Sequence, residues 1–203
     1  MITIGIDTGA TGAVAVGSQP TDLSVFDLIP EPLTIGRQSR NVASIGYFVE
    51  NIRRYLAPDV RAVAFLEAPV LQPKNGTVNA AQTGATLGGL RGALLALGVR
   101  VEIVEPQIWY AHHGLVGTST RGRKGATAAE TRERKLAAKL ANVSRACLLF
   151  PRLAAVFHPP AEVRVTKAGK PHKSQPASRP AFDRADAALI WSFGHTTLGG
   201  SSC

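Results

Sequence analysis

The first part of the chain carries three short apolar segments separated by turn residues. They lie at 2–6 (ITIGI), 12–16 (GAVAV) and 23–29 (LSVFDLI), and Gly9 and Gly12 provide the turn between the first two. Short apolar runs bounded by glycine or proline are typical of buried strands. Three consecutive strands joined by short turns predict an antiparallel meander.

Beyond residue 40 the apolar positions alternate between helical and strand spacing. Ile45, Phe48 and Ile52 recur at helical spacing, whereas 62–67 (AVAFLE) is a continuous apolar run that Pro69 ends. The full pattern predicts helices at 42–56, 79–97, 106–115, about 127–143 and 182–193, strands at 62–67 and 99–105, and a loop over 30–40. A strand that returns after a helix joins the sheet in parallel. The pattern therefore predicts an α/β domain with a mixed five-stranded sheet, antiparallel strands on one side and parallel strands on the other, flanked by helices.

The length of 203 residues suits one domain of ordinary size. We expect this domain to span 1–195 and to contain an irregular insertion at 151–180, which is rich in proline and lysine. The tail at 196–203 is expected to be disordered, because it consists of small and polar residues.

The charge of the chain is strongly positive and unevenly distributed. The formal net charge is +9 and the isoelectric point is about 10.2. Residues 121–180 hold 14 Lys and Arg against three Glu, so the whole positive excess lies in this part of the chain. Either this excess is a solvated face or it binds a polyanion, and its localisation favours a polyanion, of which nucleic acid is the usual one.

Four carboxylates are predicted to meet at one edge of the sheet. Asp7 and Glu67 end two strands that we expect to be parallel neighbours, and Asp183 and Asp186 lie three apart at the start of a helix. Four carboxylates in one place repel one another unless hard divalent cations lie between them, which indicates Mg²⁺ or Mn²⁺. Two such ions would hold a scissile phosphate, activate a water and stabilise the leaving oxygen.

Each acid also has a purely structural interpretation. Asp7 could cap the turn at Thr8 and Gly9, and Glu67 could be a surface residue at a strand end. Asp183 and Asp186 could favour the positive N-terminus of their helix. The combination, with all four at the ends of core elements of a basic protein, favours the metal site.

Three motifs of this sequence, "IGIDTGATGAVAV", "AFLEAP" and "FDRADAALIW", resemble the acidic motifs of the RuvC-like Holliday junction resolvases of the ribonuclease H-like superfamily. The resemblance implies that Asp7, Glu67, Asp183 and Asp186 are the catalytic metal ligands, and that the fold is ribonuclease H-like. It implies a homodimer that nicks a four-way DNA junction symmetrically, for which the Gly-rich helix 79–97 is a candidate interface. "PQIWYAHHGL" resembles the Pro-x-x-Trp stretch of phage and organellar members, which often carry Lys at the position of Tyr110.

Several residues outside the acidic motifs are candidates for DNA contacts. Leu71 could insert at the junction centre, and Lys74 and Asn75 could contact DNA near the cut. The basic candidates are Arg121, Arg123, Lys124, Lys167, Lys170 and Lys173. His112 and His113 are expected to be structural, because a metal-activated water needs no protein base.

Other functions remain compatible with the sequence. "GIDTGATGAVAV" also resembles the first phosphate loop of the actin, sugar-kinase and Hsp70 superfamily, but the chain is short for its two duplicated domains. A different ribonuclease H-like nuclease, acting on RNA–DNA hybrid or other branched DNA, fits the four acids equally well, and a binding-only relative is a third alternative. No small-molecule cofactor or membrane association is expected. We expect a cytoplasmic location, the host cytoplasm for a phage protein or an organelle after removal of a transit peptide.

Overall fold

The computed structural model describes residues 1–69, 76–115, 127–158 and 181–199. Its main sheet has five strands in the order β3-β2-β1-β6-β7. The strands are β1 (Ile2–Ile6), β2 (Ala13–Gly17), β3 (Ser24–Asp27), β6 (Ala62–Glu67) and β7 (Arg100–Val104). The first three form the antiparallel meander, and β6 and β7 continue the sheet in parallel with β1. The predicted mixed five-stranded sheet is thus confirmed.

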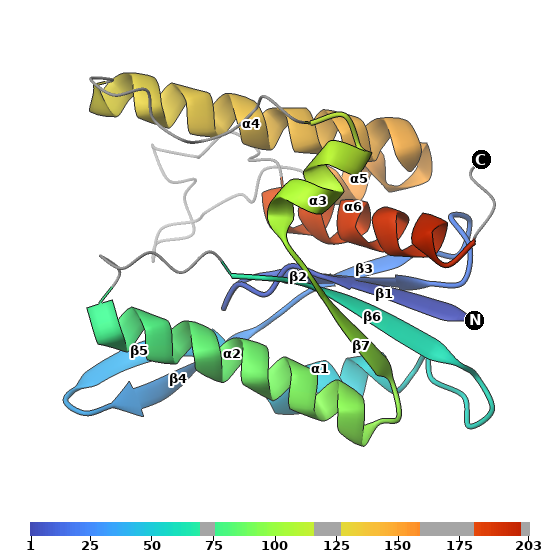
Figure 1. The fold of residues 1–203 in the computed structure, drawn as a ribbon, viewed down its shortest axis with the longest axis horizontal. Helices are drawn as coiled ribbons and strands as arrows, with labels where there is room; N and C mark the ends of the chain where they lie inside the picture. The colour runs from blue at the N-terminus through green and yellow to red at the C-terminus, as the bar shows by residue number, and fades with distance from the viewer. Residues whose placement is uncertain (70–75, 116–126, 159–180, 200–203) are drawn as a thin grey trace, which may run out of the picture.

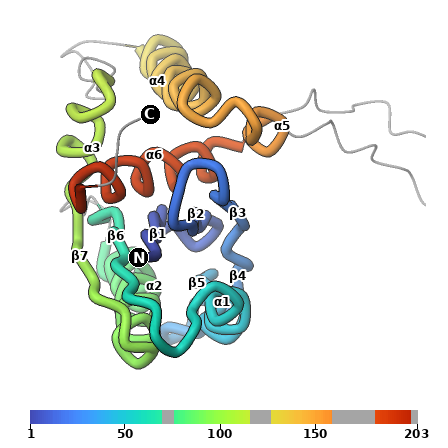
Figure 2. Tube along the Cα trace, turned by 90° about the vertical axis from the view of Figure 1, so that its right-hand side faces the viewer, coloured from blue at the N-terminus to red at the C-terminus, as the bar shows by residue number. Residues whose placement is uncertain are grey.

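Helices cover both faces of this sheet (Figures 1 and 2). On one face, α1 (Ile45–Ile52) and α2 (Gly76–Ala96) pack over an aliphatic core that includes Ile4, Leu66 and Leu90. On the other face, α6 (Phe182–Thr197) lies directly on β1 and β2, and α4 (Ala128–Leu149) packs outside it. Three short elements complete this layer: α3 (Pro106–His112), the 3₁₀ turn η2 (Pro151–Leu153) and α5 (Ala154–Phe157).

Two glycines let α6 approach the sheet closely. A Cβ atom at Gly5 of β1 would lie 2.3 Å from the backbone nitrogen of Trp191 and 2.5 Å from the carbonyl oxygen of Ala187. A Cβ atom at Gly194 of α6 would lie 2.2 Å from the ring of Phe65. Real Cβ atoms do not come this close to other atoms, so the spacing between α6 and the sheet depends on both glycines.

The structure corrects some predicted boundaries. The loop expected at 30–40 is a two-stranded ribbon of β4 (Pro30–Ile35) and β5 (Gln38–Ala43), turned at Gly36, whose φ is 61°. The ribbon is a separate sheet with edges on both sides, where proline is tolerated in a strand. The predicted capping box of Thr127 and Glu130 is confirmed, but α4 continues to Leu149.

The end of α6 also differs from the prediction. Gly194 lies inside the helix, where the ring of Phe65 leaves no room for a Cβ atom, and α6 continues to Thr197. Residues 196 and 197 therefore belong to this helix rather than to the expected tail. In the part of the chain that the structure describes, no helix is both long and apolar enough to cross a membrane.

Candidate active site

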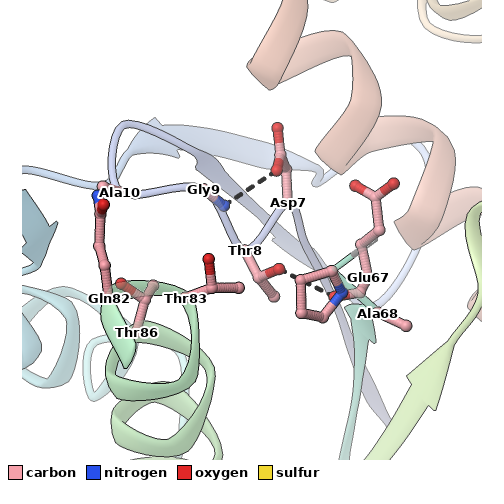
Figure 3. Close-up of a pocket in the computed structure, with 10 residues that line it drawn as sticks. Asp7, Thr8, Gly9, Ala10, Glu67, Ala68, Gln82, Thr83 and Thr86 are labelled. Atoms are coloured by element: carbon pink, nitrogen blue, oxygen red, sulfur yellow. Dashed lines mark hydrogen bonds between the residues drawn. The ribbon is translucent and has the colours of Figure 1, made fainter. Parts of the chain in front are cut away.

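The parallel pairing of β1 with β6 places Asp7 and Glu67 side by side. Ile6 pairs with Leu66, so the next residue of each strand lies at the same edge of the sheet. The Thr8 hydroxyl donates a hydrogen bond of 2.9 Å to the Glu67 carbonyl and ties the two strand ends together. Figure 3 shows both carboxylates directed to the same side, toward the ribbon of α6. Asp7 also accepts a hydrogen bond of 3.1 Å from the Gly9 amide, so it caps the turn as well.

The first turns of α6 bring the other two acids to this edge. Asp186 is only 9% exposed, and one of its oxygens, Oδ1, accepts a hydrogen bond of 2.7 Å from the Asn142 amide of α4. Asp183 is more exposed, and its Oδ1 lies 3.9 Å from the Lys139 ammonium of α4. The spacing of three residues on α6 is therefore matched by the same spacing on α4.

The four acids act on one another electrostatically. Burial, followed by the charge of Asp183, raises the pKa of Asp7 to about 6. Burial raises the pKa of Asp186 to about 7, with the charge of Asp7 as the next cause. Glu67 is the most perturbed, because burial and then the charges of Asp7, Asp186 and Asp183 raise its pKa to about 9. Burial also raises the pKa of Asp183. The charges of these acids therefore act on one another in the structure, and their role as metal ligands stays a prediction.

Carboxylate oxygens are the ligands that a hard divalent cation prefers, but these four carboxylates do not surround a single point in the structure. Among the described residues, no three His, Cys, Asp or Glu side chains form a group that could hold a metal ion as they stand. The four carboxylates nevertheless offer oxygen ligands and a negative charge that the protein only partly balances. Binding of an ion would require these side chains to draw together.

Three residues beside the acids had no role in the sequence-based site. Lys139 and Asn142 of α4 contact Asp183 and Asp186, respectively. Lys139 and Asn142 lie three residues apart, but this spacing indicates a role only once α4 is known to pack on α6. Tyr110 of α3 is the third. Its pKa is raised to about 12 by burial and then by the charge of Asp186, so its hydroxyl stays protonated beside the acids.

Two cavities are lined by members of the four acids. One of about 280 Å³ is lined by Asp7, Glu67 and the α2 residues Gln82 and Thr83 (Figure 3). The other, of about 340 Å³, is lined by Asp183 and Lys139 among others. Asp7 and Glu67 therefore border one cavity, and Asp183 borders the other.

The remaining sequence-based candidates have other outcomes. His113 is buried, its Nε2 lies 2.8 Å from the Leu189 carbonyl oxygen, and burial lowers its pKa to about 4, as suits a structural histidine. All the predicted DNA contacts lie outside the described residues and remain predictions: Leu71, Lys74, Asn75, Arg121, Arg123, Lys124, Lys167, Lys170 and Lys173.

The raised pKa values predict how stability changes with pH. An acid whose pKa is raised on folding stabilises the fold below its ordinary pKa, and this contribution is lost as the pH rises through the folded value. Because the pKa of Glu67 is about 9 and that of Asp186 is about 7, we expect the melting temperature in EDTA to fall between pH 7 and 9.5. His113, whose pKa is lowered, contributes a change of opposite sign only below about pH 6.5, outside this window.

Thermal unfolding in EDTA and in Mn²⁺ checks this expectation. Mn²⁺ should raise the melting temperature more at pH 9 than at pH 7, because more of the carboxylates are ionised there. The variant Glu67→Gln should melt higher than wild type at pH 9 in EDTA and show a weaker dependence on pH. A wild-type melting temperature that is flat or rising over this range in EDTA would contradict the electrostatic description of the site.

Comparison with known proteins gives one kind of match. No protein-family model matches the chain, and no curated protein sequence matches it. Among solved structures, Thermus thermophilus RuvC in complex with a Holliday junction substrate is 14% identical in sequence to this chain, with a TM-score of 0.47. A second structure of Thermus thermophilus RuvC is 15% identical, with a TM-score of 0.42. Both similarities cover 100% of this chain and 99% of the other. These identities and scores are low, so the case for a function rests on the arrangement of the site residues themselves.

Proposed function

We propose that this protein is a metal-dependent endonuclease that resolves four-way DNA junctions by paired, symmetric nicks. The observation that carries the proposal is the convergence of Asp7, Glu67, Asp183 and Asp186 at one edge of the sheet. It depends on the parallel register of β1 and β6 and on the close packing of α6 against Gly5. Burial raises the pKa of all four acids, and neighbouring acids of the set raise it further in Asp7, Glu67 and Asp186. Such an arrangement is costly for stability, and a site for divalent cations is the chemistry that it serves.

In this proposal Asp7, Glu67 and Asp186 hold two Mg²⁺ or Mn²⁺ ions, with Asp183 as the fourth, more exposed ligand. When bound, the ions would supply a nucleophilic water and stabilise charge at the scissile phosphate. The residues around them provide positioning. Asn142 holds one oxygen of Asp186 and leaves the other for an ion, and Thr8 fixes the ends of β1 and β6 relative to each other.

Basic side chains of α4 support binding of a polyanion. Within the described part of the chain, four of them are exposed: Arg132, Arg134, Lys135 and Lys139. The last of these lies beside the acids. A phosphate backbone that contacts α4 would therefore pass close to the carboxylates.

A cleavage assay with Mg²⁺ tests this function. The substrates are a synthetic four-way junction, an RNA–DNA hybrid and plain duplex DNA of the same sequence. We expect paired nicks in the junction and little cutting of the other two. Preferential cutting of the hybrid would assign the chain to the other ribonuclease H-like nucleases. Absence of cutting in all three substrates, by a folded protein that binds junctions, would favour a binding-only protein.

The phosphotransferase alternative receives no support from the described fold. Its superfamily uses a duplicated domain, whereas the described residues contain a single five-stranded sheet and one two-stranded ribbon. ATP hydrolysis, measured in the same preparations, would show directly whether this alternative holds.

We propose further that the protein acts as a homodimer and that α2 forms its interface. One side of α2 packs on the sheet through Thr86, Leu90 and Leu94. On its other side Gly84, Gly88 and Gly92 have open space around the position of a Cβ atom, so a second helix could approach closely. Two active sites related by a twofold axis would suit the near-twofold symmetry of a junction.

Sedimentation velocity of a matched pair of variants tests the interface. Gly88→Arg should convert the dimer to a monomer that keeps its fold, because nothing in its own chain lies near the new side chain. Gly46→Arg is the control, since Gly46 is an exposed glycine of α1 with the same open space. A monomeric wild type, or a dimeric Gly88→Arg variant, would rule out this interface.

A further inference from the structure

Lys139 lies at the mouth of the carboxylate cluster without being buried in it. Its ammonium is 3.9 Å from Asp183 and 5.0 Å from the centre of the Phe182 ring, and its side chain is 49% exposed. Both neighbours belong to the start of α6. The ammonium is thus held in place by a cation–π contact and by one long ion pair, while one side of it faces solvent.

The charge of Lys139 acts on the whole cluster. It lowers the pKa of Asp183, and it also lowers the pKa of Asp7, Glu67 and Asp186, in each case against the effect of burial. The ammonium therefore lies where it partly balances the acids in the absence of other cations.

Of the two cations that line the 340 Å³ cavity, Lys139 is the weakly bound one. The other, Arg184, is fixed by Asp27 of β3, whose two oxygens accept hydrogen bonds of 2.7 and 2.6 Å from its guanidinium. A bidentate pair of this kind is strong and leaves little reason for Arg184 to move. Lys139 has a flexible stem and a compact charge, which suits it to exchange one anionic partner for another.

We propose that Lys139 binds a backbone phosphate of the substrate strand in this cavity, next to the cut. In the metal-free protein its ammonium balances the carboxylates. Ions held by the carboxylates would repel the ammonium, which could then bind the phosphate in place of Asp183. This inference rests on the proposed function, because it needs both the ions and a nucleic acid strand.

The test compares Lys139→Met with Lys135→Met. Lys135 lies one turn earlier on α4, is exposed and forms no ion pair with any described residue, so both changes remove one charge from the same helix. In the absence of DNA, Lys139→Met should bind Mn²⁺ several-fold more tightly than wild type, because a competing cation is gone. Lys135→Met should bind Mn²⁺ as wild type does.

Binding of a synthetic four-way junction across a salt series provides a second readout. With Ca²⁺ present, Lys139→Met should flatten the dependence of log affinity on log salt by about 0.9, the effect of one lost phosphate contact. In EDTA the slope should match wild type, because Lys139 then stays with the carboxylates. A purely structural role for Lys139 would not depend on the divalent ion in this way. Lys139→Arg should restore the wild-type slope in Ca²⁺.

The outcomes separate this inference from the proposed function. A Lys139→Met variant that has the Mn²⁺ affinity of wild type, and whose salt slope differs from wild type by the same amount in Ca²⁺ as in EDTA, would overturn the role of Lys139 while leaving wild-type cleavage intact. A wild-type protein that neither binds Mn²⁺ nor cuts junctions would overturn the proposed function instead. Circular dichroism reports whether each variant folds, and Lys139→Gln replaces the Met variant in both readouts if that one does not.

Discussion

Neutralising one carboxylate of the cluster is expected to abolish cleavage of four-way junctions while leaving junction binding nearly unchanged. The variants are Asp7→Asn, Glu67→Gln and Asp186→Asn, which keep the size of each side chain. Residues that merely support metal ligands typically cost 10- to 100-fold when changed, so loss of a ligand should cost at least about 100-fold in rate. Binding should persist because affinity for DNA comes mostly from Lys and Arg near phosphates.

Single-turnover cleavage and a binding titration in Ca²⁺ check the two halves of this expectation. Asp183→Asn serves as an internal comparison, since Asp183 is the more exposed acid and is paired with Lys139, and its effect should be smaller. The two-ion assignment fails if any of the first three variants cuts junctions in Mg²⁺ at close to the wild-type rate.

The variant Gly5→Ala is expected to damage both the fold and the site. The new methyl group would lie against the backbone of α6 at Trp191 and Ala187, and backbone cannot move aside as a flexible side chain can. Overpacking of a core typically costs about 1–3 kcal/mol. Any shift that relieves the clash moves α6, and with it Asp183 and Asp186, away from Asp7 and Glu67.

Urea denaturation and Mn²⁺ titration measure the two effects of Gly5→Ala separately. Gly46→Ala is the control, because Gly46 is an exposed helical residue of α1 with open space around it, where alanine favours the helix. Wild-type stability together with wild-type Mn²⁺ affinity in Gly5→Ala would show that the close approach of α6 does not position the site.

The sequence was sufficient to predict the four acids because each stands at the end of a strongly patterned element. The apolar runs before Asp7 and Glu67 define β1 and β6, and the rule that strands following helices pair in parallel places these two residues together. The spacing of Asp183 and Asp186 then defines one side of a helix. The local hydrophobic pattern and the rules for strand connections were therefore enough to predict where these acids lie in the fold.

The residues that sequence reasoning missed depend on packing between distant segments. Lys139 and Asn142 lie on a helix that carries several other charged residues, and nothing local distinguishes Lys139 from Lys135. Their role becomes visible only when α4 packs on α6 in the observed register. The predicted end of the last helix at residue 193 was wrong for the same reason, since a glycine such as Gly194 near a helix end predicts termination unless a tertiary contact, here with Phe65, requires it.

The β4–β5 ribbon was predicted as a loop because its sequence contains residues that are unusual in strands. Pro30 and Pro32 argue against a strand in a sheet interior, but both strands of this ribbon have a free edge within the described structure. The turn at Gly36 lacks the Asn-Gly or Asp-Gly pair that would have indicated a hairpin.

The central claim is that these four carboxylates bind divalent ions, and anomalous diffraction from crystals soaked in Mn²⁺ tests it most directly. We predict two anomalous peaks per chain, both in contact with oxygens of Asp7, Glu67, Asp183 or Asp186, with the carboxylates drawn closer together than in the metal-free protein. A map of the same crystals with no peak among these residues, or with peaks held only by other side chains, would contradict the claim.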